Sequence, residues 1–136
     1  GLNGRPLKPI ERSGAPVALT KSDIRDAIDR EVADDGEDRS KQVEASYASM
    51  TFPQVLPAYT QMLVDADDHL WVRPFPRGTG NLVSWSIFTP AGALVGEVAV
   101  PRHLEVFEIG RDYVLGRYMD PKEAIPEVRL YRLKRS

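Results

Sequence analysis

The second half of the chain repeats its own hydrophobic pattern 43 positions later. When the sequence is shifted onto itself, Asp65 falls on Glu108. With the same shift, Trp85 falls on Val128, and no gap is needed between these two points. Few residues are identical, but apolar and polar positions alternate in both copies, and Asp-, Gly- and Pro-rich turns separate the runs. This pattern predicts a mainly β fold with two antiparallel units of the same kind.

A period of about 40 to 50 residues with four strands per unit is typical of β-propeller blades. The expected strands are 60–66, 69–75, 82–89 and 93–100 in the first blade, and 104–109, 112–119 and 126–135 in the second. The second blade then lacks its outermost strand, and the segment Arg5 to Glu11 is a candidate to fill that edge, in its own chain or in a neighbour. An unrelated β-sandwich is the alternative fold.

The N-terminal part of the chain has a helical pattern instead. Thr20 and Asp23 predict a capped helix start, and Gly36 predicts its end. A weaker helix is expected near 38–48, before a proline-containing linker. The acidic run 34–38 is interpreted as a solvated helix end and turn rather than a cation site. The expected organisation is an N-terminal strand, helical insertion and linker over 1–58, a first blade over 59–101 and a second over 102–136.

Three segments carry a resemblance to a known family. They read MLVDADDHLWVRPF, SWSIFTPAGALVGEVAVP, and IGRDYVLGRYMD followed by EVRLYRLKR. They resemble the C-terminal end of bacterial six-bladed β-propellers of the NHL/TolB-like kind, over residues 14–136. The resemblance implies the fold more than the activity, because such propellers serve as binding modules, scaffolds and lactonase-type hydrolases. It also implies a periplasmic or secreted location, although no signal peptide opens this chain.

Composition excludes several classes of function. The chain has 136 residues, with 18 Lys and Arg against 20 Asp and Glu, so it is not a generally basic nucleic-acid binder. The absence of cysteine excludes a disulfide scaffold, a thiol nucleophile and a Cys-type zinc site. No apolar run approaches the ~18 residues of a membrane span. No G-x-S-x-G motif marks a serine hydrolase.

Two blades are too few for a closed propeller, and this predicts a homo-oligomer. Each blade has two apolar faces, and an isolated pair leaves its two outer faces exposed, which soluble monomers rarely tolerate. Three chains of two blades would close a six-bladed ring. In the alternative, the helical segment 20–48 folds over one exposed face and the protein remains a monomer or dimer.

Propeller topology also predicts where ligands bind. One set of loops gathers at one end of both blades and carries the candidate binding residues Tyr59, Arg77, Asn81, Arg102 and Lys122. His103 lies at the same end, and three copies around an axis would form a site for zinc or another divalent metal, calcium included. Glu105 or Asp120 would then orient water or act as base. The other interpretation of His103 is an ordinary exposed loop residue.

Two functions follow from these expectations. The first is a self-associating partial propeller that binds a small molecule or partner on its top face. The second is a metal-dependent hydrolase of esters, lactones or phosphoesters at the channel mouth.

Overall fold

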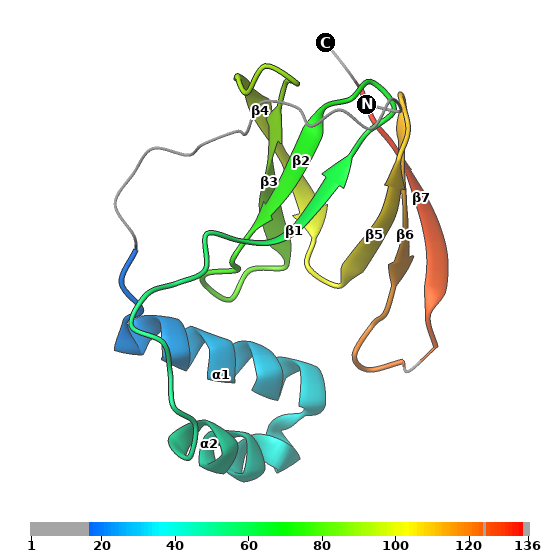
Figure 1. Ribbon diagram of the computed structural model, residues 1–136. Coiled ribbons are helices and arrows are strands. Elements are labelled where there is room, and N and C mark those ends of the chain that lie inside the picture. The colour runs from blue at the N-terminus through cyan, green and yellow to red at the C-terminus, as the bar shows by residue number, and fades with distance from the viewer. Residues whose placement is uncertain (1–16, 124, 135–136) are drawn as a thin grey trace.

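The computed structural model describes residues 17–123 and 125–134, which form a mainly β structure with a short helical region (Figure 1). The helical region consists of α1 (Lys21–Asp35), the 3-10 turn η1 (Glu37–Arg39) and α2 (Ser40–Ala48). The strands are β1 (Tyr59–Val64), β2 (Leu70–Pro74), β3 (Leu82–Phe88), β4 (Leu94–Pro101), β5 (Leu104–Ile109), β6 (Tyr113–Tyr118) and β7 (Glu127–Arg132).

The strands form two antiparallel sheets, in the order β1-β2-β3-β4 and β5-β6-β7. The two helices and the seven strands lie in the regions where the sequence predicts them, and the mainly β expectation is confirmed. The predicted strand Arg5 to Glu11 lies outside the described residues. The propeller interpretation of the two sheets stays a prediction.

The hydrophobic core lies between the two sheets. Trp71 is 2% exposed and Trp85 is 1% exposed, and both belong to one cluster with residues of the second sheet. The other buried members are Val83, Val100, Leu104, Val106, Ile109 and Val114. At the closest approach of the sheets, β1 lies beside β5, and the Gln61 side-chain amide donates a hydrogen bond to the Val106 carbonyl oxygen at 3.3 Å. The aromatic residues that dominate this core therefore pack the sheets together, as their strand positions predict.

The 43-residue shift aligns the first three strands of the first sheet with the three strands of the second. The alignment is off by one residue at the last strand, β7. Trp71 pairs with Ile87, sixteen positions later, whereas the equivalent Val114 pairs with Tyr131, seventeen positions later. Because side chains alternate between the two faces of a strand, one extra residue turns every side chain of β7 to the opposite face. The gapless alignment is therefore wrong at β7, and Val128, the counterpart of the buried Trp85, is 76% exposed.

The turn between β1 and β2 is organised by one buried carboxylate. One Asp65 oxygen accepts the backbone N–H groups of Asp67 and His69, both at 2.9 Å. The other accepts the indole N–H of Trp71 at 2.9 Å. An Asp-rich turn is expected between the predicted strands 60–66 and 69–75, and the turn is confirmed.

The segment that enters α1 and the segment that leaves α2 lie side by side. The Leu19 N–H donates to the Gln54 carbonyl oxygen at 2.9 Å, and the Leu56 N–H donates to the Val17 carbonyl oxygen at 2.8 Å. Between these points α1 packs against α2, and the two helices bury Ile28 and Val43. No helix in the described part of the chain is long and apolar enough to cross a membrane.

The helices cover neither outer sheet face. They lie across the end of the sheets that carries the β2–β3 and β4–β5 loops (Figure 1). The alternative in which the helical segment 20–48 folds over an exposed face is therefore wrong for the described residues. The physical reason is that the residues of α1 that meet the sheets are charged and reach loops rather than an apolar surface.

We expect Asp65→Asn to lower the free energy of unfolding by about 2 kcal/mol, because the amide nitrogen cannot accept a hydrogen bond and leaves a buried donor unsatisfied. Urea denaturation measures the change. Asp68→Asn is the matched control in the same turn, since Asn tolerates the positive φ of 61° at that position. Equal stability of the two variants would contradict the role assigned to Asp65.

Candidate functional site: the loop face under α1

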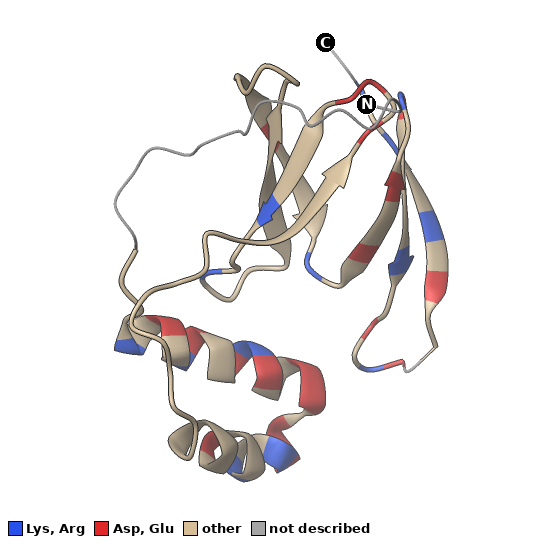
Figure 2. Ribbon diagram, viewed as in Figure 1, with Lys and Arg blue, Asp and Glu red and all other residues tan. Residues whose placement is uncertain are grey.

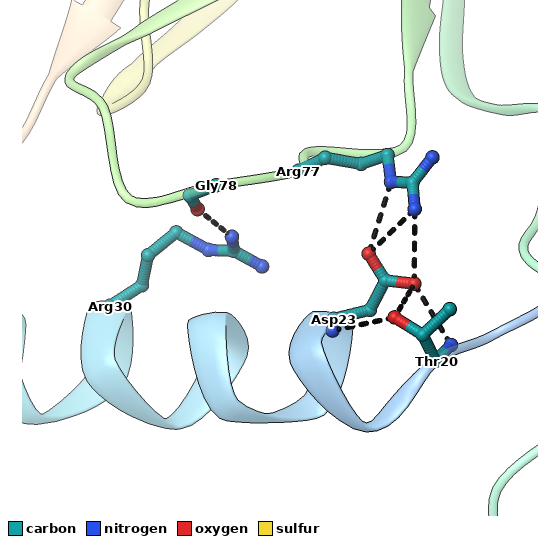
Figure 3. Close-up of polar contacts among 5 residues, drawn as sticks. All are labelled: Thr20, Asp23, Arg30, Arg77 and Gly78. Atoms are coloured by element: carbon teal, nitrogen blue, oxygen red, sulfur yellow. Dashed lines mark hydrogen bonds and ion pairs between the residues drawn. The ribbon is translucent and has the colours of Figure 1, made fainter.

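The loop face is the end of the two sheets formed by residues 75–81, 102–103, 119–123 and 125–126, between β2 and β3, β4 and β5, and β6 and β7. It is the face on which the sequence predicts ligand binding. In the structure α1 lies across it (Figure 1). The helix contacts it at three points along its length, of which Figure 3 shows the first two.

The first contact joins the start of α1 to the β2–β3 loop. Arg77 donates to both oxygens of the buried Asp23 carboxylate, from Nε at 3.0 Å and from Nη2 at 3.2 Å. Asp23 also accepts the backbone N–H and the hydroxyl of Thr20, both at 2.9 Å, which completes the predicted helix cap (Figure 3). The Thr20 backbone N–H above all, with the Thr20 hydroxyl and Arg77, holds the pKa of Asp23 below its ordinary value of 3.8, although burial acts in the opposite direction.

The second contact uses a glycine carbonyl in the same loop. The Arg30 guanidinium donates to the carbonyl oxygen of Gly78 (Figure 3). Gly78 has a φ of 74°, in the left-handed region that favours glycine. The glycine thus allows the backbone turn that presents this carbonyl to α1.

The third contact lies at the end of α1. Arg102 reaches both oxygens of Asp34, from Nη1 at 3.4 Å and from Nη2 at 3.2 Å. The His103 Nε2 atom lies 3.0 Å from Asp34 Oδ1. The Arg102 side chain is only 12% exposed, so this contact is more enclosed than the one at Asp23 and Arg77, where the arginine is 51% exposed. His103 is thus a partly buried residue held by a carboxylate rather than a free loop residue.

Asp23, Arg30 and Asp34 share one side of the helix, because positions i, i+7 and i+11 lie nearly one above another. The sequence predicts Asp23 as a cap only, and it predicts Asp34 as part of a solvated acidic run. Their roles in contacting the loops were missed. The spacing of the three charged residues was the available signal, but it does not say which distant residues they meet.

A cavity of about 500 Å³ opens beside the third contact, between the end of α1 and the β6–β7 loop. Arg129 stacks over the Tyr118 ring at 3.7 Å and donates to the Tyr131 hydroxyl at 3.2 Å. The hydrogen bonds to Tyr131 and then Glu127 raise the pKa of Arg129, which also forms an ion pair with Glu127 at 3.0 Å.

The cavity brings together five of the residues predicted from the sequence, Asn81, Arg102, His103, Asp120 and Lys122. Arg77 lies at a smaller hollow of about 270 Å³ that Arg30 and Arg102 also line. Tyr59 and Glu105 lie at neither. Glu105 forms an exposed ion pair with Arg117 at 2.7 Å, on the outer face of the second sheet.

In the part of the chain that the structure describes, no three His, Asp or Glu side chains gather as a metal site. A zinc or calcium site with His103 as ligand therefore depends on contributions from several chains, and it stays a prediction.

Comparison with protein-family models, with curated proteins and with solved structures finds no match to this chain.

We expect acid to loosen the start of α1. The pKa of Asp23 is lower in the folded than in the unfolded chain, so its stabilising effect is complete above 3.8 and is lost as the pH falls through the folded value. NMR chemical shifts of the α1 amides, followed from about pH 5 to about pH 2, measure this change. Asp23→Asn should remove much of the pH dependence, whereas Asp26→Asn on the same helix should retain it. An unchanged acid profile in Asp23→Asn would contradict the assignment.

Proposed function

We propose that this protein is a self-associating β module, built as part of a propeller, that binds a ligand or partner on its loop face. The observation that carries the proposal is a group of exposed apolar side chains on the outer face of each sheet. In the described residues, no element of the chain covers either face, and an exposed apolar area of this kind marks an interaction surface.

The outer face of the first sheet has a row of apolar side chains on β1. Met62 is 48% exposed and Val64 is 60% exposed. Met62 pairs with Val72 and Val64 with Leu70, so the apolar surface continues onto β2. Leu70 pairs with Phe88 on β3, and Phe88 pairs with Leu94 on β4, so the apolar surface extends across the sheet.

The outer face of the second sheet is centred on β7. Val128 is 76% exposed and Leu130 is 65% exposed. Leu130 pairs with Leu115 on β6, and Phe107 on β5 is exposed as well. Two different apolar faces on one chain favour a head-to-tail contact, in which the first sheet of one copy packs on the second sheet of the next.

Several features support a ring with propeller geometry. β4, the last strand of the first sheet, continues directly into β5, the first strand of the second, and β1 lies beside β5. The two sheets of one chain already pack through apolar faces, which gives a pattern for the contact between chains. Three chains would supply the six blades that the family resemblance implies. The loop faces of all copies would then lie on one side of the ring.

The hydrolase alternative requires His103 from three chains at one metal. No observation on a single chain favours it specifically, so the proposal is the binding module.

Size-exclusion chromatography with light scattering tests the assembly. We expect a mass of three times the 15.2 kDa chain. Val64→Lys blocks the outer face of the first sheet and Val128→Lys blocks that of the second, and each variant alone should be monomeric. Both positions are exposed, so folding should change by only about 0.5 kcal/mol. Lys41→Glu on α2 is a control that should assemble like the original chain.

Mixing the two blocked variants makes the test specific. Each retains the face that the other has lost, so the mixture should form dimers and nothing larger. A monomeric original chain would overturn the proposed assembly. Dimers of either variant alone would overturn the head-to-tail contact.

A further inference from the structure

The helical region and the sheets differ in charge. Residues 21–48 carry nine Asp and Glu against five Lys and Arg, whereas residues 49–136 carry ten of each. The acidic residues lie along α1 and α2, and basic residues occur at the end of the sheets that faces them (Figure 2). An acidic helix therefore covers a surface that contacts it through two arginines and one backbone carbonyl.

The attachment of α1 to the loop face is polar. The apolar core between the sheets contains no residue of α1 or α2 in the described chain, and the buried apolar residues of the helices are Ile28 and Val43. Ion pairs that are partly exposed contribute little net stability, because water and salt compete for the same groups. The contact at Arg77 is of this kind, since half of its side chain is exposed.

Arg77 donates hydrogen bonds to both carboxylate oxygens of Asp23, and Arg102 donates to both of Asp34. A planar guanidinium in this geometry recognises a carboxylate and not the chain that carries it. We propose that the loop face is a docking site for an acidic helix of a partner protein, and that α1 occupies this site in cis until the partner displaces it. The proposal rests on the proposed binding role of the loop face and names the chemistry of the partner.

The spacing of the two arginine contacts favours a helix over a small anion. Asp23 and Asp34 are eleven residues apart, which corresponds to about 16 Å along a helix. A single phosphate or small carboxylic acid spans much less than this distance. The Gly78 carbonyl between the two arginines adds an acceptor for a cationic side chain, the part that Arg30 plays in α1.

The cavity beside Asp34 gives a partner helix an advantage over α1. It is lined by Lys122 and Arg129 as well as Arg102, and Lys122 has no ion pair within the described chain. Asp120 is also present, where its side chain accepts the backbone N–H of Lys122 at 2.9 Å. A partner with a further carboxylate past the position of Asp34 can reach Lys122, which α1 does not contact.

A labelled peptide with the sequence of residues 19–36 is the probe, and fluorescence anisotropy with the full chain is the readout. We expect binding to an Asp23→Asn, Asp34→Asn chain to be at least about tenfold tighter than to the original chain, because the cis competitor has been weakened. Adding Arg77→Gln or Arg102→Gln to that chain should weaken binding about tenfold. Lys41→Glu, away from the loop face, should leave it unchanged.

The matched control is a peptide in which both aspartates are replaced by asparagine, and it should not bind. Near-UV circular dichroism of the core tryptophans checks that each variant is folded. Equal binding of the two peptides, or equal binding to the original and the Asp23→Asn, Asp34→Asn chains, would overturn the proposal. The mass of the chain is measured on the same samples, so that helix docking and ring assembly are tested separately. A monomeric chain that binds the peptide would contradict the ring and leave the docking site supported.

Discussion

Each of the two sheets has one face buried against the other sheet and an outer face with exposed apolar side chains. The buried pair, centred on Trp71 and Trp85, holds the sheets together and fixes the position of every loop. The exposed apolar residues follow from the same strand pattern, since Val64, Val128 and Leu130 occupy outward positions of strands whose other side faces the core. The stability of the fold and its capacity for association thus have one origin.

The loop face depends on this packing in a different way. The β2–β3 loop belongs to the first sheet, and the residues that grip Asp34 lie where the chain crosses from the first sheet to the second. A helix can therefore contact both loops at once only when the core holds the two sheets in their observed relative position. The apolar core sets the positions of the loops. Because the core contains no residue of α1, removal of the helix would expose no core residue.

The alternation of residues and the turn composition located the strands, and Thr20, Asp23 and Gly36 located α1. These features are local, which is why one sequence reveals them. The face of β7 was not predictable, because it depends on one additional residue between Val114 and Tyr131 that only strand pairing shows. The contact of Asp34 with Arg102 joins residues 68 positions apart, and no local sequence pattern predicts it. Five of the predicted loop residues line one cavity, and their role in binding stays a prediction. The helix that covers them was not anticipated.

The short bridge between Ala18 and Val55 has a consequence for how this chain can change over time. Because the helical region departs and returns at neighbouring points, its loss or replacement would leave the path into β1 almost unaltered. The sheets would remain as they are, with their loops uncovered. The helical segment is thus separable from the framework of the sheets, and variation in it can alter access to the loops without changing the core.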